Sequence, residues 1–230
     1  MKTTPSIFAV LAVGLAALGT MLADDEKPQG RTCISIVAPG APEHEVVFSP
    51  NALRGPGMKI KIYADASVKS GVIAVAFRKD GKLAEGWRPE ITELPEDFEE
   101  VHLPKPPAVW ECSSQGAPFD LYIVFLSFGV KDLEELKKLI SAMQNPKVDE
   151  RLLVMQTSKL RELINRITAA AEKENRVVVI NPEVGGVFRG PAFPWRQFAK
   201  KVDFSPAQPG VLVFSSPEAE SSKAAPAASQ

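Results

Sequence analysis

Residues 119–146 read FDLYIVFLSFGVKDLEELKKLISAMQNP and decide the class of fold, because the hydrophobic period changes inside them. The first ten residues are mostly apolar, aromatic or β-branched, which is typical of a strand. After Gly129 the period becomes helical, and Pro146 ends it. The residues at helical spacing are Leu133, Leu136, Leu139, Ile140 and Met143. Asp132 and Glu135 resemble a capping box, so the stretch predicts a strand followed by a helix.

Upstream of this stretch, the sequence between residues 32 and 128 is typical of strands separated by turns. The predicted strands are TCISIV, HEVVF, MKIKIYAD, GVIAVAFRKDG, AVWEC and FDLYIVFLSF. In MKIKIYA, apolar residues alternate with Lys59, Lys61 and Tyr63, which predicts one buried face and one wet face. Asp80-Gly81 predicts a two-residue hairpin turn with positive φ at both central positions. These patterns favour antiparallel pairing.

Downstream, a second helix is predicted within residues 149–175, beginning between Asp149 and Ser158. Its apolar stripe consists of Leu160, Leu163, Ile164, Ile167 and Ala171. Two further strands follow in RVVVINP and in GVLVFSS, residues 210–216. We therefore predict an α+β fold, a mainly antiparallel β-sandwich-like domain with a two-helix insertion packed on it. The alternative is an α/β unit in which FDLYIVFLSF, the helices and RVVVIN form a parallel crossover.

The N-terminus has the pattern of a secretory signal peptide. Lys2 precedes an apolar run that ends near Ala23 and is followed by two aspartates. An uncleaved membrane anchor is the alternative, since this run is at the lower limit of a bilayer-spanning helix. We expect a signal peptide at 1–23, a spacer at 24–31, one globular domain at 32–216 and a disordered tail at 217–230. Export to the periplasm or the exterior follows, and membrane contact follows only if the segment is uncleaved.

Composition restricts the partners. The formal net charge is −1, with 27 basic and 28 acidic residues, so no electrostatic attraction to nucleic acid or anionic lipid is expected.

The two cysteines, Cys33 and Cys112, would meet an oxidising compartment after export, which favours a disulfide between them. Two buried, unpaired thiols are the alternative.

Signatures of catalysis are absent from the sequence. It contains no nucleophile elbow, phosphate-binding loop, zinc-protease helix or paired C-x-x-C motif, and we expect neither a cofactor nor a metal site. One acidic segment could gather carboxylates and an imidazole: Glu93, Glu96, Asp97, Glu99, Glu100 and His102. Its spacing does not match a calcium loop, so we interpret it as a solvated loop. The alternative is a hydrolytic acid and base formed by Asp97 and Glu100.

Aromatic and basic residues are concentrated in residues 185–204, GGVFRGPAFPWRQFAKKVDF. If a short helix begins after Pro194, Trp195, Phe198 and Ala199 share one face and the cations share another. That division suits a segment docked on the core. In the functional interpretation the side chains stay partly exposed and bind a partner, either an envelope protein or a glycan. The candidate binding residues are Phe193, Trp195, Arg196, Arg189 and Lys200.

One part of the sequence resembles a bacterial exported β-sandwich module of unknown function. It consists of LRGPGMKIKIYADASVKSGVIAVAFRKDGKLAEGW, followed by FDLYIVFLS. The resemblance covers roughly residues 50–140 and implies a binding or accessory role without catalytic residues. We therefore predict an exported, non-catalytic binding or accessory protein of the bacterial cell envelope that uses an aromatic and basic surface at 188–204. An envelope hydrolase with carboxylates near 96–100 is the alternative.

Overall fold

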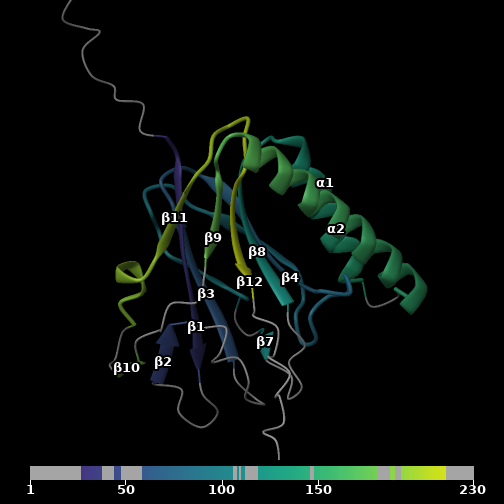
Figure 1. The fold of residues 1–230 in the computed structure, drawn as a ribbon, viewed down its shortest axis with the longest axis horizontal. Coiled ribbons are helices and arrows are strands. Elements are labelled where there is room, and N and C mark those ends of the chain that lie inside the picture. The colour runs from purple at the N-terminus through teal and green to yellow at the C-terminus, as the bar shows by residue number, and fades with distance from the viewer. Residues whose placement is uncertain are drawn as a thin grey trace, which may run out of the picture.

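The protein is a sandwich of two β-sheets with a helical hairpin packed on one of them (Figure 1). The computed structural model describes residues 27–37, 44–47, 59–105, 108, 110–111, 119–145, 148–180, 187–189 and 193–215; within 44–47 and 187–189 it describes the backbone alone. The α+β class and the mostly antiparallel, sandwich-like arrangement are confirmed.

In the described residues the first sheet has seven strands. They are β1 (Gln29–Val37), β2 (His44–Val47), β3 (Lys59–Ala66), β6 (Val101–Leu103), β7 (Trp110–Glu111), β10 (Val187–Arg189) and β11 (Lys200–Asp203). Their order is β10-β2-β1-β3-β6, with β11 paired to the first half of β1 and β7 paired to β3. All of these pairings are antiparallel.

The second sheet, over the part of the chain that the structure describes, has five strands in the order β5-β4-β8-β12-β9. They are β4 (Ser70–Arg78), β5 (Glu90–Leu94), β8 (Phe119–Ser127), β9 (Val177–Ile180) and β12 (Gly210–Ser215). Strand β9 is parallel to β12, and β12 is antiparallel to β8. The strands that flank the helices, β8 and β9, therefore run in opposite directions. The predicted parallel crossover between them is wrong, because β9 runs antiparallel to β8, with β12 between the two strands.

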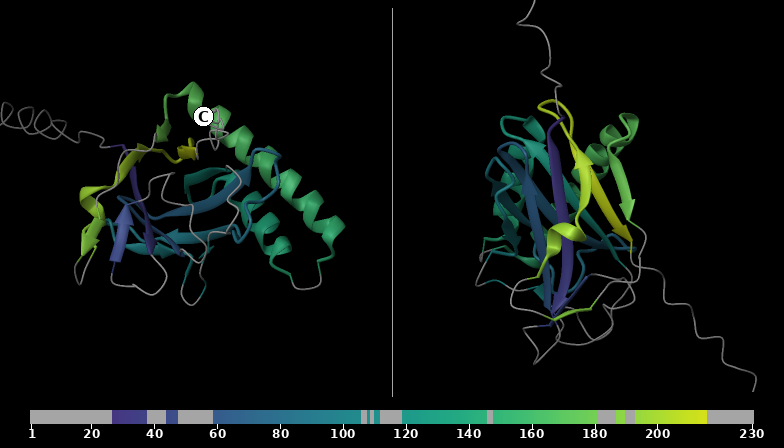
Figure 2. Two further views of the ribbon diagram at one scale, coloured as in Figure 1. Left: turned by 60° about the horizontal axis from the view of Figure 1, so that its bottom comes forward. Right: turned by 90° about the vertical axis from the view of Figure 1, so that its left-hand side faces the viewer.

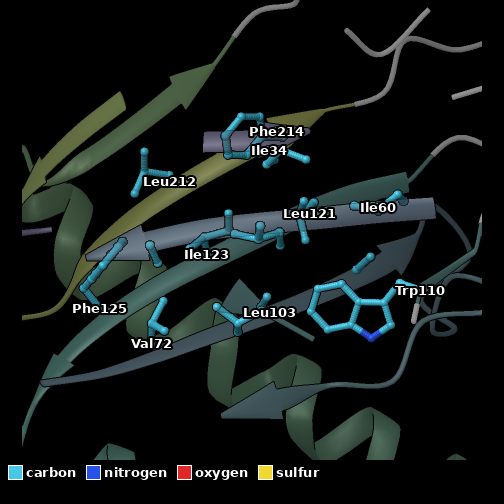
Figure 3. Close-up of a cluster of buried hydrophobic side chains, with 14 of the residues drawn as sticks. Ile34, Ile60, Val72, Leu103, Trp110, Leu121, Ile123, Phe125, Leu212 and Phe214 are labelled. Carbon is cyan, nitrogen blue, oxygen red and sulfur yellow. The ribbon is translucent and has the colours of Figure 1, made fainter. Parts of the chain in front are cut away.

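The main hydrophobic core lies between the sheets (Figure 3). Ile34 and Ile60 come from the first sheet and meet Leu121, Ile123 and residues of β12 from the second. The alternation predicted for β3 is confirmed on this side, since Ile60, Ile62 and Ala64 are all buried in this core.

A second core lies between the five-stranded sheet and the helices α1 (Lys131–Met143) and α2 (Glu150–Lys173). Every residue of the predicted stripe on the second helix is buried there. Strands β4 and β8 are apolar almost throughout because they are covered on both faces, by the first sheet and by the helices. The left panel of Figure 2 shows the helical hairpin lying across this side of the sandwich.

Two local predictions need correction. Helix α1 has Val130 at its N-cap and no side-chain capping bond; Asp132 and Glu135 instead accept hydrogen bonds from Arg166 of α2, each at 2.8 Å. The turn after β4 has positive φ at Gly81 and not at Asp80. Its hydrogen bonds join Gly81 N–H to Arg78 C=O and Arg78 N–H to the carbonyl of the residue after Gly81. This is a three-residue loop with a glycine bulge, which needs only one positive φ.

The chain enters the fold earlier than expected. Strand β1 begins at Gln29, within the predicted spacer, because Gln29 and Gly30 pair with Asp203 and Val202 of β11. The predicted signal peptide and tail lie outside the described residues. Within the described part of the chain, no helix is both long enough and apolar enough to cross a bilayer.

Candidate binding surface

Residues 193–199, which we call the docked segment, lie across the outer face of the seven-stranded sheet. The short 3₁₀ helix η2 (Trp195–Gln197) contacts β1, and the right panel of Figure 2 shows this segment crossing in front of that strand. In the register of β1, β3 and β6, Cys33 is opposite Tyr63, and Tyr63 is opposite His102. Because opposite residues of a ladder point to the same face, these three side chains share the outer face that η2 covers.

Trp195 is the centre of this contact. Its side chain is 3% exposed and packs in a small cluster with Cys33 and Tyr63, separate from the two cores. The indole stacks on the Tyr63 ring at 5.8 Å between centroids and 19° between planes. Trp195 therefore fits the docking interpretation, and the expectation that it stays partly exposed as an anchor is wrong.

Two phenyl rings remain at the edge of the cluster. Phe193 and Phe198 are half-buried and stack on each other at 6.0 Å with 8° between their planes. Phe193 also contacts Tyr63 at 5.5 Å. The shared face predicted for Trp195, Phe198 and Ala199 is confirmed, with Trp195 buried and the other two partly buried against the cluster.

A buried carboxylate holds two arginines beside these rings. The side chain of Asp65 is fully buried and accepts two hydrogen bonds from Arg31, at 2.8 and 2.7 Å. It also accepts one from Arg196 Nε at 3.2 Å. Arg196 is 50% exposed and reaches the carbonyl of Phe98 with its Nη2 at 2.9 Å. One carboxylate thus fixes two cations that come from opposite ends of the chain.

Phe98 lies beside these two arginines, in a turn of the acidic loop, residues 95–100 between β5 and β6. Asp97 and Phe98 both have positive φ, 61° and 57°, which costs free energy for residues other than glycine. The turn is held by the Phe98 N–H bond to Ala66 C=O at 2.8 Å and by the guanidinium of Arg31, 4.0 Å from the centre of the Phe98 ring. We call Phe98, Phe193, Phe198, Arg31 and Arg196 the aromatic–basic surface.

Glu100 links the acidic loop to the docked segment. Its carboxylate accepts a hydrogen bond from Trp195 Nε1 and pairs with His102 Nε2 at 2.6 Å. Partial burial opposes ionisation of Glu100, but the hydrogen bonds and charges of His102, the Trp195 bond and the charge of Arg196 outweigh it, so its pKa is below the ordinary value. A carboxylate that stays ionised suits a hydrogen-bond acceptor better than a general acid.

The predicted site residues have different positions. Phe193, Trp195 and Arg196 lie together, whereas Lys200 is half-buried at the start of β11. Arg189 lies in β10, but its side chain is outside what the structure describes. Cys33 is buried on the outer face beneath Trp195, and Cys112 lies outside the described residues, so the disulfide stays a prediction.

The binding residues predicted from the sequence did not include Arg31, Asp65 or Phe98. The alternation in β3 predicted a wet face for Tyr63, yet Tyr63 and Asp65 are buried by the docked segment and by β6. An aspartate in a strand-forming run, KIKIYADA, is the one signal that could have suggested a buried ion pair, since aspartate is depleted in strands.

Among the described residues, no group of three or more histidine, cysteine and acidic side chains could hold a metal ion. No protein-family profile matches the chain, and comparisons with curated proteins and with solved structures found no similar protein. The resemblance to an exported β-sandwich module therefore stays a prediction from the sequence.

Proposed function

We propose that this chain is a non-catalytic binding or accessory protein of the bacterial cell envelope, and that it binds an envelope protein or glycan through the aromatic–basic surface. The main support is the exposed guanidinium of Arg196. It is held by Asp65 and by the carbonyl of Phe98, and it lies beside half-buried phenyl rings. Arginine and aromatic side chains dominate the energetics of protein interfaces. Side chains that are already ordered lose less entropy on binding.

The buried residues support this surface from below. Trp195 stacks on Tyr63, and Asp65 neutralises one of the two cations it holds. A partner would contact ring edges and guanidinium nitrogens that are held against the sheet by Asp65 and by the stacked Trp195, which favours a precise site. The formal net charge of −1 makes nucleic acid a poor partner.

Location in the envelope rests on the signal-peptide pattern at 1–23. Cleavage would release the protein into the periplasm or the exterior, and an uncleaved segment would anchor it. Sequencing of the mature N-terminus distinguishes the two forms. A mature chain beginning near Asp24 supports export by cleavage, and a protein found only in the cytoplasm would contradict the proposed location.

The binding test uses matched arginines. Arg196→Ala removes an arginine of the surface, and Arg166→Ala removes one from the helical side. The two are 50% and 57% exposed, and each is held by two oxygen acceptors. Co-sedimentation of each purified chain with isolated cell-wall polysaccharide, and crosslinking to envelope proteins, measure binding.

We expect Arg196→Ala and Phe198→Ala to weaken binding by about tenfold or more, equal to about 1.4 kcal/mol. Arg166→Ala should bind like the unchanged chain. Equal binding by all variants, with melting temperatures showing that each is folded, would contradict the proposal.

The alternative of an envelope hydrolase has less support. Glu100 is engaged by His102 and Trp195, and its lowered pKa is in the wrong direction for a general acid at neutral pH. No specific contact of Asp97 favours it as the second carboxylate.

A further inference from the structure

Among the strands that the structure describes, β9 forms an edge of the five-stranded sheet, and it consists of four β-branched residues, Val177 to Ile180. In the right panel of Figure 2 it lies at the margin of the sandwich, with β12 on its inner side. Val179 is 62% exposed, while Val178 and Ile180 pack against the main core and Val177 packs against the helical core. One large apolar side chain of a well-packed strand therefore faces solvent.

The backbone of β9 also has hydrogen-bonding groups that point outward. The carbonyl of Arg176 accepts a hydrogen bond from Val211 N–H of β12 at 3.0 Å. Carbonyl and N–H directions alternate along a strand, so those of Val177 and Val179 point away from β12. Such a row can pair with another strand.

The opposite edge of the same sheet differs from β9. Strand β5 reads EITEL and carries Glu90 and Glu93, and charged side chains are a common protection of edge strands. If β5 paired with its own copy, like charges would come together across the contact. Strand β9 has no charge and no proline, so its own copy fits it without such repulsion.

We propose that β9 is a self-association edge, at which it pairs antiparallel with β9 of a second copy of this chain. The site is separate from the aromatic–basic surface and does not rest on the proposed binding function. A two-fold axis through Val179 makes the contact isologous. Val179 then lies opposite its own counterpart, and Val178 lies opposite Ile180.

This register satisfies both the backbone and the side chains. The outward N–H and C=O groups of Val179 in each copy exchange hydrogen bonds across the axis. Opposite residues point to the same face, so the two exposed Val179 side chains cover each other and each core-facing residue meets another. The two five-stranded sheets become one continuous sheet. Four-residue strands bury little area, so the dimer depends on protein concentration.

The test compares two exposed valines in the full chain. Val179→Lys places a charge on the edge, whereas Val154→Lys places one on α2 at a valine of similar exposure, 62% against 64%. Light scattering after size exclusion, at several protein concentrations, gives the mass. We expect dimers for the unchanged chain and for Val154→Lys, and monomers for Val179→Lys at the same concentrations.

A covalent trap tests the register. Opposite residues of an antiparallel pair with exchanged hydrogen bonds have Cα atoms about 5.5 Å apart, within the range of a disulfide. Under mild oxidation Val179→Cys should therefore form a covalent dimer, and the unchanged chain and Val154→Cys should not. A monomeric unchanged chain overturns the proposal. A dimer that survives Val179→Lys also overturns it, because association then occurs elsewhere, for example through another strand or the apolar N-terminal run.

Discussion

Both sheets of the sandwich are covered on their outer faces, but by different means. The helices α1 and α2 cover the five-stranded sheet with an apolar core of leucine, isoleucine and valine. Residues 193–199 cover part of the seven-stranded sheet with one buried indole, two half-buried phenyl rings and a half-exposed arginine that binds a buried carboxylate. The ion pair at the helical side, Arg166 with Asp132 and Glu135, is solvent-exposed.

This difference indicates how each cover is stabilised. Periodic apolar burial is spread over many side chains, so no single polar contact decides whether the helices dock. The docked segment is short and lacks a long hydrophobic stripe. It relies on a few contacts, which its partners on β1, β3 and β6 must supply.

Removal of the buried indole should have the largest effect. Trp195→Ala is expected to lower the free energy of unfolding by about 3 to 5 kcal/mol, because it leaves a cavity between η2 and Tyr63. Denaturant unfolding measures it, with half-buried Phe198→Ala as the milder control. A loss below about 1 kcal/mol would show that the segment is not part of the cooperative fold.

The second-largest loss of stability is expected on changing the buried carboxylate of Asp65. Asp65→Asn should destabilise the fold by about 2 to 3 kcal/mol, because Arg31 and Arg196 lose a charged acceptor that is fully buried. Asp120→Asn is the control, since its salt bridge to Lys79 is exposed and contributes about 0 to 1 kcal/mol. Equal losses for the two variants would mean that burial of Asp65 adds nothing.

Acidification should weaken the docked segment through Glu100. Its folded pKa is below its unfolded pKa, so its contribution is fully present above the unfolded value of about 4.3. It is lost as the pH falls through the folded value. The melting temperature of Glu100→Gln should therefore be lower than that of the unchanged chain at neutral pH, with the gap closing in acid.

Exposed Glu93→Gln serves as the control for this titration. A gap between Glu100→Gln and the unchanged chain that stays constant across the acid range would show that ionisation of Glu100 does not stabilise the fold.

The smallest effect belongs to the helical side. Arg166→Ala should cost about 0.2 to 1 kcal/mol, because Arg166 is 57% exposed and its carboxylate partners can be solvated. Denaturant unfolding in low and high salt measures the loss, which should shrink as salt screens the charges. If this loss matched that of Asp65→Asn, the contrast between the two covers would fail.

The packing of the helices on the five-stranded sheet could be predicted from the sequence. Leu160, Leu163 and Ile164 lie at spacings that only a helix brings to one face, so local periodicity predicted both the helix and its buried side. The docked segment could be predicted only in part. Local spacing predicted the apolar face of Trp195 and Phe198. No local pattern indicated that Arg31, Asp65 and Phe98 lie together.

The wrong predictions were those in which a local sequence pattern was used to infer a contact between residues far apart in the chain. The outer face of β3 alternated as a wet face would, yet residues more than 100 positions away cover Tyr63. Asp132 and Glu135 had the spacing of a capping box, but Arg166 of the neighbouring helix binds them both. In each case a partner distant in the sequence overrode the local motif.

The sequence by itself determined the class of fold, the apolar stripes of the two helices and the face of η2 that docks, because these depend on periods of two or about 3.6 residues along the chain. The tertiary structure decided the insertion of β12 between β8 and β9, the edge position of β9 and the joining of two arginines by Asp65. These features depend on which strands pair, and strand pairing joins residues far apart in the sequence whose local patterns are compatible with several partners.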